Sequence, residues 1–336
     1  MRPTGVRHSA LVRFVIYGAG AIGGAIGAKL HEAGREVVLI ARGRQLEALQ
    51  ERGLRLQTPE GEQRFAVPVV GSPREIQLTA DDVVLLATKS QDTATALDEL
   101  SDVADANVAV ICTQNGVDNE RVALRRFEHV YGVFVYVSAQ LLEPAVIQVF
   151  SAPTLGVLDL GRVPRGSDER AGAIAADLRA SGFASRVDGE IMRWKYGKLL
   201  SNLANAVEAL LGPEARGGEL VGRAREEALA CYSAAGIDYA SREEIAQRAR
   251  GHEELRPVDG LTRRGGSSWQ SLARQSAGIE TAYLNGEIVL LGRLHGVFTP
   301  VNRALTELAL RAASHGVQPG SLTKVEIEEA ISSPSR

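Results

Sequence analysis

The sequence predicts an α/β protein in which an N-terminal doubly wound sheet is followed by an all-helical C-terminal domain. Three observations support this prediction. An apolar strand runs directly into a glycine-rich turn, short apolar runs alternate with helical or turn-rich stretches, and strand signals nearly vanish after Glu190. At 336 residues the chain exceeds the usual size of one core, so we expect two domains, 1–188 and 189–330.

The first strand is expected at Leu11–Tyr17, a short and nearly all-apolar run that is typical of a strand buried on both faces of a parallel sheet. The glycine-rich segment Gly18–Gly24 follows it. Residues 25–33 then have helical composition and end at Gly34, a suitable C-cap. The order of elements is therefore strand, glycine turn and helix.

Further apolar runs predict the rest of the sheet. Strands are expected at Val37–Ala41, Val83–Ala87 and Val108–Thr113, with helical or turn-rich stretches between them. Three later β-like stretches are separated by turn residues, and we expect them to extend the sheet as a meander: Val130–Ala139, Ala145–Phe150 and Thr154–Leu160.

Long amphipathic stretches predict helices in the second half, at Ile191–Leu211, Glu219–Ala235 and Ser271–His295. The segment 251–268 is rich in Gly, Arg and Pro, and we expect a mobile loop near a site there. The residues after Glu329 are expected to fray.

Composition excludes several classes of partner. The formal net charge is −3, and no run of Lys or Arg forms a footprint for nucleic acid or anionic lipid. The two cysteines, Cys112 and Cys231, suggest buried thiols rather than a disulfide framework or a metal cluster. No apolar segment has the length of a signal or membrane span, so we expect a cytoplasmic protein with small-molecule partners and a loose extension at residues 1–10.

The glycine turn has the spacing of a dinucleotide-binding Rossmann motif, Gly18-Ala19-Gly20-Ala21-Ile22-Gly23. In such a motif the first glycine permits the tight turn, the second lets the backbone approach the pyrophosphate, and the third lets the helix pack closely on the sheet. The phosphates lie at the helix N-terminus. The alternative is a glycine turn that binds no ligand.

The end of the second strand indicates which dinucleotide binds. An NAD-selective site usually has Asp or Glu there, but this chain has Arg42-Gly43-Arg44. Guanidinium groups bind phosphate in bidentate fashion, so the sequence favours NADP(H) over NAD(H). Alternatively, these arginines are solvated charges that follow a strand.

Polar residues also follow two other predicted strands, Thr88-Lys89-Ser90 and Gln114-Asn115-Gly116. Ligands of open α/β sheets bind outside the carboxyl ends of the strands, so Lys89 and Asn115 are candidates for contact with cofactor or substrate. Lys89 is equally consistent with a solvated loop lysine, and Asn115 with turn chemistry.

Reduction of a ketone by hydride builds negative charge on its oxygen and requires a proton donor. At about 100° per residue, one polar arc of the helix beginning near Glu190 contains a lysine and two asparagines, and an apolar arc adjoins it. The polar arc consists of Lys198, Ser201, Asn202 and Asn205, and the apolar arc of Leu199, Leu203, Ala206 and Leu210. This helix is a candidate cleft wall, or else a surface helix with a solvated face.

With these motifs the chain resembles the ketopantoate reductase (2-dehydropantoate 2-reductase) family from about Val12 to Ala312. The segments that carry the resemblance are GAGAIGG, LIARGRQLEAL, the Lys89 segment, the Asn115-Gly116 turn, WKYGKLLSN and SSWQSLARQSAGIETAYLNGEIV. The resemblance implies the same two-domain architecture. It also implies NADPH-dependent reduction of 2-dehydropantoate to (R)-pantoate, in pantothenate and coenzyme A biosynthesis.

The resemblance also implies roles for individual residues. Lys198 corresponds to the general acid that protonates the carbonyl oxygen, and Glu280 to the active-site glutamate. Ser268 corresponds to a serine that binds substrate, and Asn115 and Asn202 to asparagines of the nicotinamide and substrate pocket. Two roles remain open for Glu280, to hold Lys198 charged and oriented or to bind a substrate hydroxyl.

Two departures from the family concern the substrate. The family commonly has an asparagine where this chain has Ala206, with Asn205 one position earlier, and another where it has Gly217. Arg263 and Arg264 are candidates for a replacement carboxylate anchor, or are simply solvated. Three alternatives follow: reduction of 2-dehydropantoate, reduction of another branched 2-oxo acid, or a non-catalytic NADP(H)-binding sensor. A homodimer is also possible.

Overall fold

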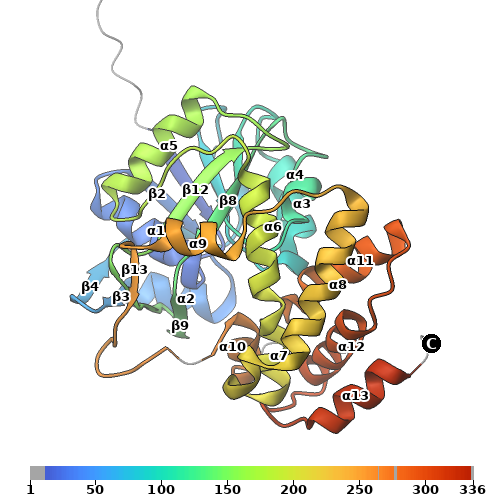
Figure 1. The fold of residues 1–336 in the computed structure, drawn as a ribbon. Coiled ribbons are helices and arrows are strands. Elements are labelled where there is room, and N and C mark those ends of the chain that lie inside the picture. Colours follow the sequence, from blue (N-terminus) through green and yellow to red (C-terminus); the bar gives the residue numbers. More distant parts are fainter. Residues whose placement is uncertain (1–11, 264, 276–277, 334–336) are drawn as a thin grey trace, which may run out of the picture.

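The computed structural model describes residues 12–263, 265–275 and 278–333. A mixed α/β half and a helical half follow one another along the chain, as the sequence predicts (Figure 1). The expected extension 1–10 and Arg264 lie outside the described residues. The second half is not entirely helical, because strand β13 (Glu253–Leu255) pairs with β11 (Ser151–Pro153) of the first half.

The main sheet has seven strands in the order β12-β8-β7-β6-β1-β2-β5. They are β1 (Arg13–Tyr17), β2 (Glu36–Ile40), β5 (Val69–Val70), β6 (Val83–Leu86), β7 (Ala109–Cys112), β8 (His129–Tyr136) and β12 (Val157–Arg162). In this order, all neighbouring strands from β8 to β5 pair in parallel, and β12 is antiparallel to β8. The chain passes from β1 to β2 on one side and later returns to β6 on the other. The carboxyl ends of β1 and β6 therefore form a topological switch point, where ligands of such sheets bind.

The predicted meander is wrong in part. Strands β8 and β12 extend the main sheet, but β9 (Ala139–Glu143) and β10 (Val146–Val149) form a second sheet with β3 (Leu54–Thr58) and β4 (Gly61–Phe65), in the order β4-β3-β10-β9. The β3–β4 hairpin was not predicted. Its sequence, LRLQT followed by GEQRF, is too polar to form an apolar run.

Helix α1 (Ala21–Glu32) begins within the glycine-rich segment, directly after Gly20 and four residues before the predicted start at residue 25. Its glycines allow close packing: a Cβ on Gly23 would lie 2.1 Å from Gly18 O, and one on Gly27 would lie 2.6 Å from Leu39 Cδ2. The other helices of the first half are α2 (Gly43–Arg52), α3 (Thr93–Ser101), α4 (Asn119–Ala123) and α5 (Glu169–Ala180), with short 3-10 turns η1 (Pro73–Glu75) and η2 (Ser90–Asp92).

The second half contains α6 (Ile191–Asn202), α7 (Ala204–Leu211), η3 (Pro213–Gly217), α8 (Glu219–Ala235), α9 (Arg242–Ala249), α10 (Ser267–Ala273), η4 (Glu280–Tyr283), α11 (Asn285–His295), α12 (Pro300–Ser314) and α13 (Lys324–Ser332). The prediction for α8 is confirmed. The stretch predicted as Ile191–Leu211 is divided at Leu203. The predicted helix Ser271–His295 is wrong in part: α11 ends at the predicted His295, but α10 ends at Ala273 and Gln275 has a left-handed φ of 49°.

Two other expectations for the second half are corrected. The segment 251–268 contains β13 and the start of α10, so it is not a loop throughout. The chain is helical as far as Ser332, and a capping box between Thr323 and Glu326 stabilises the start of α13. The rest of the end that was expected to fray, residues 334–336, lies outside the described residues.

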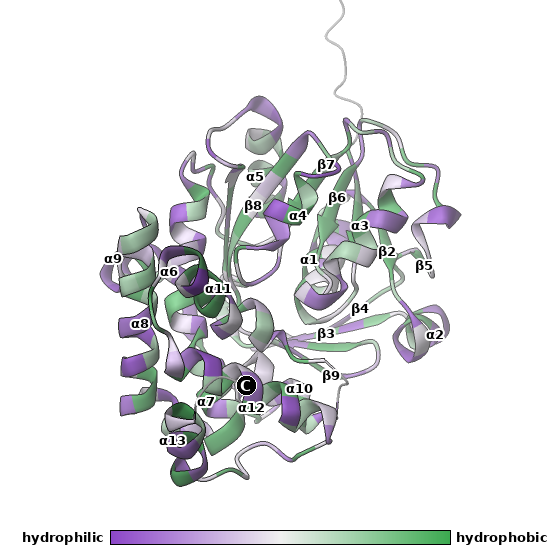
Figure 2. Cartoon of the chain, turned by 90° about the vertical axis from the view of Figure 1, so that its right-hand side faces the viewer, coloured by the Kyte–Doolittle hydropathy of each residue, from purple (hydrophilic) through white to green (hydrophobic). Residues whose placement is uncertain are grey.

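The apolar core lies on both faces of the main sheet and within the helical half. Ile16 and Leu85 pack with α1 on one face, and Val15 and Val84 pack with α3 on the other. A third cluster joins α6, α7, α8, α11 and α12. Figure 2 shows the hydrophobic strands β6, β7 and β8 inside the first half, with the helical half packed beside their ends.

Candidate active site

The glycine turn after β1 leaves open space where a phosphate approaches such motifs. Gly18 has a φ of 109°, and a Cβ there would lie 2.7 Å from Thr88 N. A Cβ on Gly20, by contrast, would meet no atom within 4 Å. Gly20 is the N-cap of α1, and no side chain caps this helix. The free amides and the space beside Gly20 fit a dinucleotide pyrophosphate.

Arg42 and Arg44 both follow the carboxyl end of β2. The Arg42 guanidinium pairs with Glu99 of α3 and donates a hydrogen bond of 3.1 Å to the Tyr17 hydroxyl. Arg44 is exposed, and no hydrogen bond or ion pair involves its side chain among the described residues. Two cations therefore lie near the expected ribose position, one of them already paired.

The loop after β6 is bound to the second half of the chain. Lys89 Nζ donates hydrogen bonds to Gly278 O at 2.8 Å and Ser271 Oγ at 3.1 Å. It is neither freely solvated nor placed in the cavity described below. Ser90 donates from both its backbone N–H and its hydroxyl to Glu280 Oε1, at 3.1 Å each. Glu280 thus contacts Ser90, and no described hydrogen bond joins it to Lys198.

The loop after β7 meets α6 at Lys198. Lys198 Nζ donates a hydrogen bond of 2.8 Å to Asn115 Oδ1. Asn115 is fixed in turn, since its carbonyl accepts from Asn119 Nδ2 at 3.0 Å. Desolvation, followed by the positive charge of Lys195, lowers the pKa of Lys198 to about 7. A lysine with this pKa can donate a proton at neutral pH and be reprotonated.

The four residues of the predicted polar arc, Lys198, Ser201, Asn202 and Asn205, all line one cavity of about 480 Å³. The Asn202 side chain has no hydrogen-bond partner among the described residues and is available to a ligand. Asn205 donates to Ser267 Oγ at 3.3 Å. Ala206 is fully buried in the helical core, so Asn205 and not residue 206 faces the cavity.

A buried ion pair that the sequence did not predict involves Lys195, three residues before Lys198 on α6. Lys195 Nζ lies 2.8 Å from Glu120 Oε1, with side-chain exposures of 3% and 0%. Lys195 also donates to Gln114 O at 2.8 Å and to Val133 O at 3.2 Å. The available signal was the spacing of Lys195 and Lys198, three residues apart on one helix face.

The two serines at the start of α10 differ in position. Ser267 lines the cavity, whereas Ser268 is 2% exposed and its hydroxyl has no partner among the described residues. Ser268 corresponds to the substrate-binding serine by resemblance, but it does not line the cavity. Its role stays a prediction, as do those of the other proposed site residues.

Four further charged residues line the cavity: Arg216, Arg242, Glu253 and Arg263. Arg216 comes from η3, the turn that ends at Gly217, and its guanidinium contacts Asn205 and Glu208. Arg242 belongs to α9, and Glu253 to β13. Only Arg263 among them was a candidate from the sequence, because α9 and β13 were not predicted.

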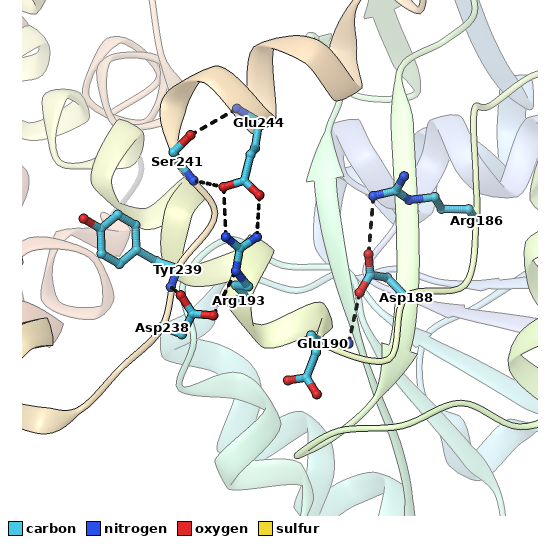
Figure 3. A network of polar contacts seen from close by, with 8 residues as sticks. All are labelled: Arg186, Asp188, Glu190, Arg193, Asp238, Tyr239, Ser241 and Glu244. Carbon is cyan, nitrogen blue, oxygen red and sulfur yellow. Dashed lines mark hydrogen bonds and ion pairs between the residues drawn. The ribbon is translucent and has the colours of Figure 1, made fainter.

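Helix α9 is held against α6 by a polar network (Figure 3). Arg193 of α6 forms two hydrogen bonds with the Glu244 carboxylate, at 2.8 and 2.9 Å, and one with Asp238 at 2.9 Å. Glu244 also forms a capping box with Ser241, and these donors lower its pKa to about 2. The network positions Arg242 and the rest of α9 at the cavity.

Two family models match the chain. The model described as "Ketopantoate reductase PanE/ApbA" matches residues 14–164, and "Ketopantoate reductase PanE/ApbA C terminal" matches residues 190–312. Together they cover well over half of the sequence. The chain belongs to the ketopantoate reductase family. It is accordingly an oxidoreductase that acts on CH–OH groups, in a family that uses NAD(P)H.

Curated relatives and solved structures agree with membership of the ketopantoate reductase family. The chain is 29% identical to the 2-dehydropantoate 2-reductase of Halobacterium salinarum, over 91% of this chain and 100% of the relative. It is 30% identical to that of Pyrococcus horikoshii, over 60% of this chain and 64% of the relative, just under two thirds of the latter's length. The crystal structure of a PanE/ApbA family ketopantoate reductase from Ralstonia eutropha JMP134 matches with a TM-score of 0.74 and 26% identity, covering 91% and 99% of the two chains.

This ketopantoate reductase family chain has no metal-binding cluster of three or more His, Cys, Asp or Glu side chains within the described ranges. Among those same residues, each helix is too short or too polar to cross a membrane.

Proposed function

We propose that the protein reduces a 2-oxo acid to a 2-hydroxy acid with NADPH, and that the substrate is 2-dehydropantoate, which yields (R)-pantoate for pantothenate and coenzyme A biosynthesis. The observation that carries this proposal is the placement of Lys198. It lines a polar cavity, contacts the loop after β7 and has a pKa lowered to about 7.

In the proposed reaction, Lys198 donates its proton to the carbonyl oxygen as C2 becomes tetrahedral. The bound NADPH supplies the hydride that C2 receives. Asn115 orients the Lys198 ammonium, and the free amide of Asn202 is suited to bind an oxygen of the substrate. The product hydroxyl thus contains the proton that Lys198 released.

The preference for NADPH rests on Arg42 and Arg44 at the end of β2. Arg44 is free to bind a 2′-phosphate, and Arg42 would exchange its pairing with Glu99 for the stronger charge of the phosphate. Gly18, Ala19, Gly20, Ala21, Ile22 and Gly23 would hold the pyrophosphate. Lys89 is bound to Gly278 and Ser271, so its proposed contact with the cofactor requires that it leave these partners.

Purified protein, 2-dehydropantoate and NADPH test the proposal directly, with oxidation of NADPH followed by its absorbance. Efficient turnover that prefers NADPH over NADH is the expected result. Tight NADPH binding without turnover of any 2-oxo acid would contradict the proposal and favour the sensor. Turnover of another branched 2-oxo acid alone would identify that acid as the substrate. The structural reason to test this alternative is that Arg216 lines the cavity.

A homodimer is proposed as the form in solution. Leu294 of α11 and Phe298 after it are 65% and 80% exposed in the single chain, an unusual position for large apolar side chains. Sedimentation analysis is expected to give the mass of two chains for the wild type and of one chain for a Phe298→Asp variant. A wild-type mass of one chain would refute the dimer.

A further inference from the structure

The cavity beside Lys198 has more positive than negative charge. Its lining contains four cationic side chains and one carboxylate: Lys198, Arg216, Arg242, Arg263 and Glu253. Among the described residues, the guanidinium of Arg263 has neither a hydrogen bond nor an ion pair. Because an anionic ligand is expected in this cavity, this unpaired cation is a candidate for its recognition.

The neighbouring carboxylates are occupied by other donors. Glu208 pairs with Arg216 and accepts a hydrogen bond of 3.0 Å from Gly266 N. Glu253 accepts a hydrogen bond of 2.7 Å from Ser138 Oγ. Arg216 lowers the pKa of Arg263, and Glu208 and Glu253 raise it, but among the described residues neither carboxylate forms a hydrogen bond or an ion pair with Arg263.

Arg263 is also partly removed from water. Its Nε is buried without an acceptor, and desolvation lowers the pKa of its guanidinium. A desolvated cation without a partner is costly to a protein, and a bound anion removes that cost. Arg242, in contrast, is exposed to solvent, which hydrates its charge.

Described residues before and after Arg263 are held in place by hydrogen bonds. Before it, Val258 and Leu261 exchange two backbone hydrogen bonds of 2.9 Å, and Val258 is 1% exposed. After it, Gly266 N binds Glu208. An anchored segment loses little conformational entropy when its side chain binds a ligand.

We propose that Arg263 is the residue that binds the carboxylate of the substrate and selects for a free 2-oxo acid. This inference rests on the proposed function. A guanidinium matches the two oxygens of a carboxylate, and the adjacent carbonyl oxygen would then face Lys198 in the same cavity. Arg263 thereby takes the recognition role that the family commonly gives to the asparagines replaced by Ala206 and Gly217.

Arg263→Gln tests this role when 2-dehydropantoate is compared with its neutral methyl ester. In the wild type, the acid is expected to have a kcat/KM about 10²-fold above that of the ester. In the variant, the KM for the acid is expected to rise about 10²-fold and the KM for the ester to stay within about threefold. The preference for the acid over the ester is then lost. NADPH affinity is expected to be unchanged, because no residue of the glycine turn lines the cavity that Arg263 lines.

Arg256→Gln is the matched control for net charge, since Arg256 belongs to the same segment but pairs with the exposed Glu254. Equal KM increases in Arg256→Gln and Arg263→Gln would overturn the proposal, because they would indicate a general field rather than a contact. An unchanged KM for the acid in Arg263→Gln would also overturn it.

Binding of oxamate, an unreactive 2-oxo acid analogue, to the NADP⁺ complex separates this inference from the proposed reaction. Calorimetry is expected to detect oxamate binding to the wild type and about 10²-fold weaker binding to Arg263→Gln. This binding result without turnover of any 2-oxo acid would support Arg263 as the carboxylate anchor and contradict the proposed reaction. Turnover of a 2-oxo acid together with equal oxamate affinities in both proteins would support the proposed reaction and contradict the role of Arg263.

Discussion

At the scale of single residues, the surroundings of Lys198 fit the role of proton donor proposed for it. It is desolvated against the cavity wall, contacts Asn115 and lies near the buried charge of Lys195. Each of these features depends on a different part of the chain. A lysine in a helical polar arc is a candidate from sequence, but its lowered pKa is a property of the assembled site.

Replacement of Lys198 by alanine is expected to lower kcat by 10²–10⁴-fold, the usual contribution of a general acid. NADPH affinity should not change, since the glycine turn is separate. Stopped-flow and steady-state measurements of NADPH oxidation test this, with Ser201→Ala from the same helix face as the matched variant. Comparable losses in both variants would assign the effect to the helix and not to the proton donor.

The pH dependence of reduction has a definite sign. Lys198 must be protonated to act as an acid, so kcat/KM should be level below its pKa of about 7 and fall about tenfold per pH unit above it. The charges that act on it are Lys195 and Arg263, which lower the pKa, and Glu253 and Glu280, which raise it. A profile that rises through neutral pH would contradict the assignment.

We predict that Lys195 is a positioning residue that acts through Lys198. The Lys195→Met, Glu120→Leu double variant removes both members of the buried pair and avoids leaving one charge unpaired. It should fold, retain activity and show an upward shift in the pKa of the kcat/KM profile, because a positive neighbour is lost. An unchanged profile would limit the pair to a structural role.

At the scale of elements, the glycine turn must pack closely against the protein and must also leave space for the cofactor. Substitutions can separate these two requirements. Gly23→Ala places a Cβ 2.1 Å from Gly18 O, so it should lower the melting temperature and weaken cofactor binding together. Gly20→Ala meets no protein atom within 4 Å, so its stability should be unchanged while the Kd for NADPH rises about tenfold or more. Calorimetry and thermal unfolding distinguish the two variants, and equal effects would refute this division.

Elements with a local signal were predicted well, and those that depend on partners far along the chain were not. The strand β1, its glycine turn and α8 have clear apolar patterns or caps. The β3–β4 hairpin is polar, and its partners lie far along the chain, because β3 pairs with β10 and α1 packs against both of its strands. Lys198, Asn202 and Asn205 were found from helical periodicity. Glu120 comes from α4 and Arg216 from η3, and no local pattern reveals that they meet Lys195 and Asn205.

At the scale of the whole molecule, the two halves are joined by polar contacts beside the cavity. Lys89 and Ser90 after β6 bind the segment of Gly278 and Glu280, and Arg121 of α4 pairs with Glu287 of α11 at 2.5 Å. These contacts come from separate strand ends and helices of the first half. The position of the substrate cavity therefore depends on how the halves dock, which local sequence does not specify.

The Arg121–Glu287 pair allows this docking to be measured. Glu287 is 3% exposed and desolvation raises its pKa, so Arg121→Met leaves a buried carboxylate without its partner. The expected loss in the free energy of unfolding is about 3–5 kcal/mol. A group whose pKa is higher in the folded state loses stability as pH rises from the unfolded value towards the folded one. The variant should therefore be weakest at about pH 8 and partly recover at about pH 5. Urea unfolding at both pH values tests this, and addition of Glu287→Gln should remove the pH dependence; a loss that is independent of pH would show that the charge of Glu287 is not its cause.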